Sequence, residues 1–151
     1  MPHGLSENNE DLRNRYRLFF SHGGDDTYIA ECFLKPTFER SGAYVFIDAG
    51  LIKYGDPFRK QILDEIRACN ELIALLTPTS IMRPWIFAEI GAALTRRKRI
   101  VAITYGPNEE ELNKLGILSL LGDSLLLQLS ERNIAMYVDQ LTGRVKEYQH
   151  A

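Results

Sequence analysis

The sequence predicts an α/β domain with a flavodoxin-like, five-stranded parallel sheet and helices on both faces. Short apolar segments typical of strands alternate five times with longer segments of helical periodicity. The inner strand segments are continuous apolar runs, a pattern typical of parallel strands buried on both faces. The 151 residues, of which 45% are hydrophobic, suffice for one domain with a sizeable core.

The first part of the chain predicts a strand, a glycine turn and an irregular helix. Residues 1–15 are polar, and we expect them to precede a single domain over residues 16–148. The segment YRLFFS (16–21) predicts the first strand, and HGG (22–24) ends it. A helix over about residues 27–40 follows, interrupted at Pro36. Three residues are candidates for its N-cap: Asp25, Asp26 and Thr27. The residues expected to face inward are Ile29, Cys32, Phe33 and Phe38.

The middle of the chain predicts two further strands and two helices. The second strand is AYVFI (43–47), followed by a glycine-containing loop, DAGLIKYGD (48–56). Pro57 opens a helix to about Cys69, and ELIALL (71–76) is the third strand. Pro84 suits the first position of the next helix, over residues 84–95. The residues expected on the inner side of the helix from Pro57 are Phe58, Ile62, Leu63 and Ile66.

The last third predicts two more strands and a long final helix. The basic run RRKR (96–99) is either a binding patch or, as we favour, a helix C-terminus where cations are locally stabilised. IVAIT (100–104) is the fourth strand, and Asn108 caps a helix with Glu111 three residues later. Residues 115–121 are apolar, with glycines at 116 and directly after the segment at 122. The fifth strand spans 125–129, and Ser130 caps a helix to about Tyr148.

Composition excludes several classes of partner. A net charge of −2 gives no basis for a nucleic-acid or anionic-membrane surface. No apolar run is long enough for a membrane span. Cys32 and Cys69 lack metal-ligand spacing, and we expect both to be buried thiols in a reducing compartment. We therefore expect a cytoplasmic protein that binds neither nucleic acid nor membrane.

Topology predicts where a site would lie. Ligands of open parallel sheets bind outside the carboxyl ends of the strands, where strand order reverses. In the flavodoxin-like order, the loops 22–26, 48–56 and 77–85 border that point. Trp85 and Glu89 follow at spacing i, i+4, on one face of the predicted helix. An exposed Glu beside a half-buried Trp is the commoner explanation of this spacing, because charged residues are mostly exposed.

The usual catalytic and cofactor motifs are absent. The sequence has no GxGxxG, P-loop or GxSxG motif. Three acids, Asp25, Asp26 and Asp48, resemble a magnesium-binding pocket. However, Asp48 follows the second strand, whereas a phosphoacceptor would follow the third strand. We therefore expect no metal. A single carboxylate can assist cleavage of an N-glycosidic bond whose leaving group is already good, such as neutral nicotinamide. The sequence permits this chemistry without demonstrating it.

Four segments in order resemble the Toll/interleukin-1 receptor (TIR) domain family: YRLFFSH, YVFIDAGLIKYGD, LIALLTPTSIMRPWIFAEIGAAL and IVAITYG. The resemblance covers residues 16–106 and is weaker beyond. It implies the five-stranded fold, with Glu89 as the NAD-cleaving residue and Trp85 lining the pocket. It also implies that residues 48–56 form the family's BB loop, which gates the site and packs against neighbouring TIR domains.

The resemblance implies cleavage of NAD+ to nicotinamide and ADP-ribose or a cyclic isomer, by a bacterial stand-alone protein of antiphage immunity. NAD+ is the substrate, and no cofactor is expected. The implied partners are further copies of the domain and a separate effector that reads the product. HGG stands where enzymatic relatives often have an aromatic and basic residues. The catalytic residue is Glu89, and the expected substrate-binding residues are Phe20, His22, Gly23, Asp48, Leu51, Lys53, Gly55 and Trp85.

Two other functions remain open. A non-catalytic TIR adaptor would use the same BB loop for homotypic binding, although it has no chemical need for Glu89. An enzyme similar to nucleoside deoxyribosyltransferases would also use a single Glu to cleave an N-glycosidic bond, but the BB-loop pattern disfavours it.

Overall fold

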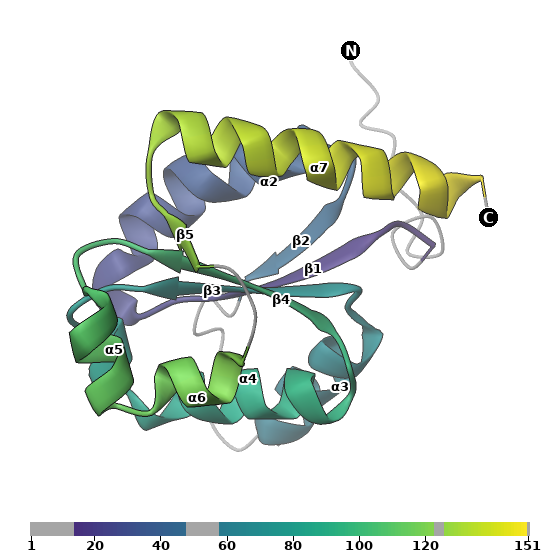
Figure 1. The fold of residues 1–151 in the computed structure, drawn as a ribbon. Helices are drawn as coiled ribbons and strands as arrows, with labels where there is room; N and C mark the ends of the chain where they lie inside the picture. Colours follow the sequence, from purple (N-terminus) through teal and green to yellow (C-terminus); the bar gives the residue numbers. More distant parts are fainter. Residues whose placement is uncertain (1–13, 48–57, 123–125, 151) are drawn as a thin grey trace, which may run out of the picture.

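The computed structural model describes residues 14–47, 58–122 and 126–150, and these form a five-stranded parallel sheet between two layers of helices (Figure 1). The strand order is β2-β1-β3-β4-β5, which confirms the predicted flavodoxin-like fold. The sheet reverses its direction of growth at β1, so the carboxyl ends of β1 and β3 are adjacent. The strands are β1 (Arg17–Ser21), β2 (Tyr44–Ile47), β3 (Glu71–Leu76), β4 (Arg99–Thr104) and β5 (Leu126–Gln128).

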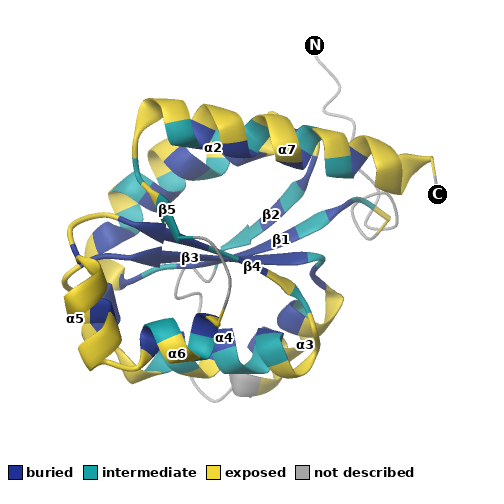
Figure 2. Ribbon diagram, in the orientation of Figure 1, coloured by how far each residue is buried: buried dark blue, intermediate teal, exposed yellow. Residues whose placement is uncertain are grey.

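Helices cover both faces of the sheet, and each face has its own hydrophobic core (Figure 2). One face packs against α3 (Phe58–Ala68), α4 (Pro84–Thr95) and α6 (Ile117–Leu121). The other packs against the π-helix η2 (Ile29–Leu34), α2 (Lys35–Glu39) and α7 (Glu131–Gln149), and α5 (Glu109–Lys114) lies beyond the carboxyl ends of the strands. In the described part of the chain, no helix combines the length and apolar character that crossing a membrane requires.

Alternation along the strands divides the side chains between the two cores. Phe19 and Leu72 point toward α3 and α4, whereas Phe20 and Ile73 point toward α2 and α7. All six residues of β3 are buried, as predicted for a central parallel strand.

The first helix differs from the prediction, because Cys32 and Phe33 are exposed. Phe38 is buried and Ile29 packs against the core, as predicted, and the other inward residues are Ala30 and Leu34. The backbone from Ile29 to Leu34 is a π-helix, and its wider turn shifts every later side chain around the axis. Pro36 explains the irregularity, because in a regular α-helix its ring would meet the carbonyl four residues back.

No side chain caps the start of this helical segment. Asp25, Asp26 and Thr27 were all candidates, but the chain enters through a 3-10 turn, η1 (Gly24–Asp26), without a side-chain cap. Thr27 Oγ1 instead donates to the carbonyl of Gly24 at 2.7 Å. The capping prediction is therefore wrong here.

The prediction that Leu63 lies on the inner side of α3 is also wrong, since 43% of its surface is exposed. Ile62 and Ile66 are buried at spacing i, i+4 and define the inner side of α3. Leu63 lies about 100° around the helix from Ile62 and so faces outward. The Phe58 side chain lies outside the described part.

The later helix ends follow the predicted local chemistry. Pro84 is the first residue of α4. The Glu111 N–H donates to Asn108 Oδ1 at 2.9 Å, and the Asn133 N–H donates to Ser130 Oγ at 3.1 Å. Gly116 and Gly122 flank α6 with positive φ, a conformation that favours glycine.

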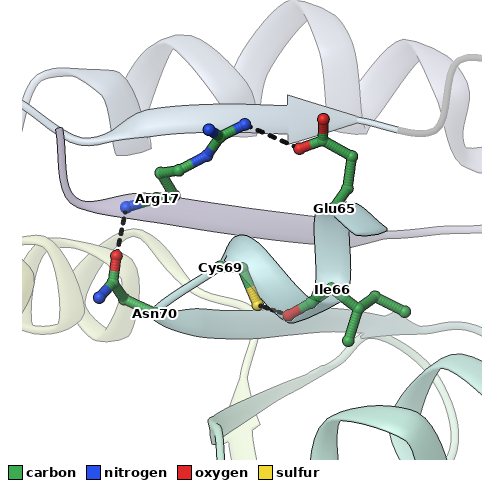
Figure 3. Close-up of polar contacts among 5 residues, drawn as sticks. All are labelled: Arg17, Glu65, Ile66, Cys69 and Asn70. Carbon is green, nitrogen blue, oxygen red and sulfur yellow. Dashed lines mark hydrogen bonds and ion pairs between the residues drawn. The ribbon is translucent and has the colours of Figure 1, made fainter. Parts of the chain in front are cut away.

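A set of contacts joins the start of β1 to the end of α3 (Figure 3). The Arg17 N–H donates to Asn70 Oδ1 at 2.8 Å, and the Asn70 N–H donates to the Arg17 carbonyl at 2.7 Å. The Arg17 guanidinium pairs with Glu65 at 2.8 Å. Nearby, Cys69 Sγ donates to the Ile66 carbonyl at 3.1 Å. These contacts help to set the register of β1 against β3, and therefore the relative position of their carboxyl ends.

The two thiols should react at very different rates. Cys32 is exposed, whereas Cys69 is buried as predicted, and burial raises the pKa of Cys69 to about 11. A raised pKa means less reactive thiolate at pH 8, in addition to the steric protection. We expect Ellman's reagent to modify one thiol rapidly in the native protein and the second only on unfolding. Cys32→Ser should remove the rapid phase; two rapid thiols in the native protein would contradict the placement of Cys69.

Candidate functional site

The loops that follow β1 and β3 are in direct contact, and we call residues 22–26 and 77–83 together the β1–β3 junction. Gly23 lies against Ser80: a Cβ added at Gly23 would lie 3.2 Å from Ser80 Cβ and 3.3 Å from Asp26 Oδ2. On the outer side, an added Cβ at Gly24 would lie 3.5 Å from the Arg83 guanidinium. The structure thus brings together two of the three loops that the topology predicted to meet.

Buried hydrogen bonds hold the junction. Thr77 Oγ1 donates to Asp26 Oδ2 at 2.7 Å, joining residues 51 positions apart. Ser80 Oγ donates to the Leu75 carbonyl at 2.8 Å and accepts from the Thr77 N–H at 2.8 Å. Because a buried hydrogen bond to a carboxylate is strong, Asp26 ties the loop after β1 to the turn that leads into α4.

Gly23→Ala tests this close approach. The added methyl group must displace Ser80 or Asp26, and overpacking of this kind costs about 1–3 kcal/mol. We expect urea unfolding to show a loss in this range, whereas Gly91→Ala, whose Cβ meets nothing within 4 Å, should be neutral or stabilising. Equal stability of Gly23→Ala and the wild type would mean that the loops are not packed at Gly23.

Helix α4 begins directly after the junction and carries Trp85 and Glu89. Trp85 is half-buried and packs against the hydrophobic core on the face of the sheet that α3, α4 and α6 cover. Glu89 lies one turn further on with only 3% of its surface exposed. The hypothesis of an exposed Glu is therefore wrong. A carboxylate is rarely buried without a specific role, structural or chemical, because burial removes the water that stabilises its charge.

His22 presents a hydrogen-bonding atom near the junction. Its Nδ1 lies 2.6 Å from the Gly23 carbonyl, which can only accept, so we assign the Nδ1–H tautomer, in which Nε2 carries the lone pair. Nε2 is buried, and no partner for it exists among the residues that the structure describes. The ring also lies 5.9 Å from the Phe20 ring. His22 can thus accept a hydrogen bond from a ligand hydroxyl.

Phe20 does not lie on the α4 side. Its fully buried ring packs edge-on against Phe38, between the sheet and α2. In this conformation it presents no surface to a ligand, and it reaches the junction only through its contact with His22. The remaining predicted residues, Asp48, Leu51, Lys53 and Gly55, lie outside the described part of the chain.

The sequence did not identify the residues that build the junction. Asp26 was considered only as a cap or metal ligand, and Thr77, Ser80 and Arg83 only as parts of a loop. The polar run TPTS after an apolar strand indicates a turn, but no local signal identifies Asp26 as its partner. The residues outside the gaps at 1–13, 48–57, 123–125 and 151 contain no group of three or more acidic, His or Cys side chains able to hold a metal.

The fold and the site define this protein as a flavodoxin-like α/β domain with a buried carboxylate on the helix that follows the β1–β3 junction. Sequence comparison then specifies the family. Residues 18–141 match the family model described as TIR domain, so the chain belongs to the TIR domain family. It is 26% identical over 100 residues to the probable 2′ cyclic ADP-D-ribose synthase BdTIR of Brachypodium distachyon, covering 66% of this chain and 45% of that protein. It is 25% identical over 134 residues to the NAD(+) hydrolase TcpC of Escherichia coli O6:H1, covering 83% and 41%. The chain thus spans less than half the length of either relative.

Solved structures agree on the fold. The TIR domain of the Toll-related receptor TRR-2 from Hydra magnipapillata superposes with a TM-score of 0.62 at 18% identity, covering 84% of this chain and 94% of that domain. The RPS4 and RRS1 TIR heterodimer gives 0.60 at 16% identity, covering 90% and 99%. The CMP N-glycosidase BcmB of Clostridium botulinum gives 0.56 at 19% identity, covering 83% and 97%. At these identities the likeness concerns the fold alone.

Proposed function

We propose that this chain cleaves the bond between nicotinamide and ribose in NAD+, with Glu89 as its catalytic residue. The observation that carries the proposal is the burial of Glu89 on α4, the helix that begins directly after the β1–β3 junction. The names of the two relatives, an NAD(+) hydrolase and a probable cyclic ADP-ribose synthase, support NAD+ as the substrate.

The chemistry requires little from the protein beyond a placed carboxylate. The C1′–N bond breaks, and its electron pair leaves with nicotinamide, which becomes neutral and needs no general acid. Glu89 stabilises the developing positive charge on the ribosyl carbon and orients the ribose hydroxyls. Water then adds to C1′ and releases a proton, giving ADP-ribose, or a nucleophile within the same molecule adds, giving a cyclic isomer. NAD+ is the substrate, and the proposal includes no cofactor.

The other site residues have supporting roles in the proposal. Trp85 borders the nicotinamide end, and His22 Nε2 accepts a hydrogen bond from a ribose hydroxyl. Gly23 keeps the junction closed by its contact with Ser80. Residues 48–56, with Asp48, Leu51, Lys53 and Gly55, enclose the substrate from the third side. The single catalytic domain spans residues 16–148.

Further copies of this domain are the proposed partners of the active state, together with a separate effector that reads the product. We place this activity in the cytoplasm, in antiphage immunity, as a signal or as NAD+ depletion. The support is the family resemblance and the association of TIR domains in the RPS4–RRS1 structure. This setting predicts that infected cells lose NAD+ when they carry the wild type and not when they carry Glu89→Gln. Equal NAD+ levels in both would overturn the setting.

A substrate panel separates the proposal from the two other functions. Concentrated protein is incubated with NAD+, CMP or deoxycytidine, and the released base is separated by chromatography. The proposal predicts nicotinamide from NAD+ and no cytosine from either cytosine substrate. Cytosine release without nicotinamide would favour an enzyme similar to nucleoside deoxyribosyltransferases. No release from any substrate by protein shown to be assembled would favour the adaptor.

A further inference from the structure

A second candidate site lies at the opposite end of the sheet from the β1–β3 junction, where β4 begins. The described part of β5 pairs with β4 from Ala102 to Thr104, at the carboxyl end of β4, and the residues directly before β5 lie outside the described part of the chain. A hollow of about 730 Å³ opens between the start of β4, the end of α4 and α7, within the size range of small-molecule sites. Its walls include Leu94, Ile100, Leu126, Met136, Tyr137 and Gln140.

The hollow is basic in a chain whose net charge is −2. Arg97, Lys98, Arg99 and Arg144 line it, and no carboxylate is among the described lining residues. Lys98 is directed elsewhere, because its Nζ donates to the Arg67 carbonyl at 2.8 Å. Three arginines, from the α4–β4 turn, β4 and α7, therefore line one cavity.

A buried carboxylate orients two of these arginines. Glu71 Oε1 lies 2.7 Å from an Nη atom of Arg144 and 3.6 Å from Arg99 Nε. Glu71 is fully buried behind the hollow, so it positions the guanidinium groups without lining the cavity. Among the described residues, one carboxylate stands against three arginines, which leaves an excess of positive charge.

Arg97 stands in a conformation that favours glycine. Its φ is +55°, and it is the one non-glycine residue with positive φ in the described chain. The Arg97 N–H donates to the Leu94 carbonyl and the Lys98 N–H to the Ala93 carbonyl, both at 3.0 Å. This is the helix-ending pattern in which the left-handed position is usually glycine. An arginine at a position that favours glycine suggests a use for its side chain.

Tyr137 supplies a further polar group. It is 4% exposed and lines the hollow, and its hydroxyl, which lies beside the guanidinium of Arg144, has no partner of full hydrogen-bond geometry among the residues that the structure describes. Burial raises the pKa of Tyr137, so its hydroxyl keeps the proton at neutral pH and can donate. A buried hydroxyl is normally satisfied, and a ligand oxygen would satisfy this one.

We propose that this hollow binds a phosphate-bearing small molecule of nucleotide size. Arg97, Arg99 and Arg144 hold the phosphate oxygens, which guanidinium groups bind in pairs, and Tyr137 donates a further hydrogen bond. The apolar part of the ligand packs on Ile100, Leu126 and Met136. The site is separate from Glu89 and does not depend on NAD+ cleavage.

Calorimetric titration with inorganic pyrophosphate and with ADP, at constant ionic strength, tests the proposal. We expect both to bind the wild type, ADP more tightly, and Arg97→Gly to weaken both by about tenfold. Arg96→Gln is the matched control, since Arg96 is the preceding residue, is exposed and does not line the hollow. It removes the same charge and should change binding less than about twofold. Arg97→Gly should also melt at a higher temperature, because glycine relieves the strained φ.

Three results would overturn the proposal. The first is no binding of either probe, and the second is equal weakening by Arg97→Gly and Arg96→Gln, which would indicate unspecific charge attraction. The third comes from NMR of the labelled protein, in which we expect ADP to shift the amide signals of residues 97–101 and Tyr137. Unchanged signals at these residues would overturn the proposal. Shifts confined to residues 22–26 and 85–89 would place ADP at the other site. Pyrophosphate that binds as tightly as ADP would refute the apolar subsite.

Discussion

Glu89→Gln is expected to lower the turnover number for nicotinamide release from NAD+ by about 10²–10³-fold, with little change in KM. Glutamine keeps the size of the side chain and can still hydrogen-bond to ribose hydroxyls. It loses the negative charge that stabilises the ribosyl cation, and removing one such stabilising group has effects of this magnitude. Initial rates at several NAD+ concentrations separate the two kinetic parameters.

The control for this variant is Glu109→Gln, which removes the same charge from the exposed first turn of α5. It should keep wild-type activity. Circular dichroism and the melting temperature should show that Glu89→Gln is folded. A folded Glu89→Gln with at least half of the wild-type turnover would remove Glu89 from the chemistry.

Arg144→Met should lower the free energy of unfolding by about 3 kcal/mol. Arg144 makes the shortest contact of the fully buried Glu71, at 2.7 Å, and removing one partner of a buried ion pair leaves the other charge uncompensated. Burial alone would lower the pKa of Arg144, but Glu71 outweighs burial and raises it, so the arginine is charged at any relevant pH. Arg99, at 3.6 Å and mostly exposed, compensates only in part.

The double variant Glu71→Leu/Arg144→Met separates a buried charge from lost packing. Replacing both partners by apolar residues should restore stability to within about 1 kcal/mol of the wild type. Urea unfolding of the wild type, both single variants and the double variant gives the coupling energy. A double variant as unstable as Arg144→Met would show that packing, and not the unpaired charge, causes the loss.

The fold was predictable because local signals agree with it. Pro84 starts α4, Asn108 and Ser130 cap their helices, and apolar runs such as ELIALL match buried parallel strands. Each of these signals acts within a few residues, and so can be recognised without knowing the three-dimensional structure.

The errors arose where a distant or unusual backbone feature decides the outcome. Cys32 and Phe33 were assigned from α-helical periodicity, which a π turn breaks. The Asp26–Thr77 hydrogen bond spans 51 positions. Glu71 was placed in the third strand without a partner, because its partner Arg144 is 73 positions away. Within the site, the spacing of Trp85 and Glu89 was predictable, but the burial of Glu89 was not.

The most direct test of the central claim is proton NMR of concentrated wild-type protein with NAD+, beside Glu89→Gln at the same concentration. The spectra show NAD+, nicotinamide and the ribosyl product together, so the broken bond is identified in the same measurement. We predict that nicotinamide accumulates in step with ADP-ribose or a cyclic isomer in the wild type, and that NAD+ stays intact with Glu89→Gln. Intact NAD+ with the assembled wild type, or equal nicotinamide from both proteins, would contradict the account.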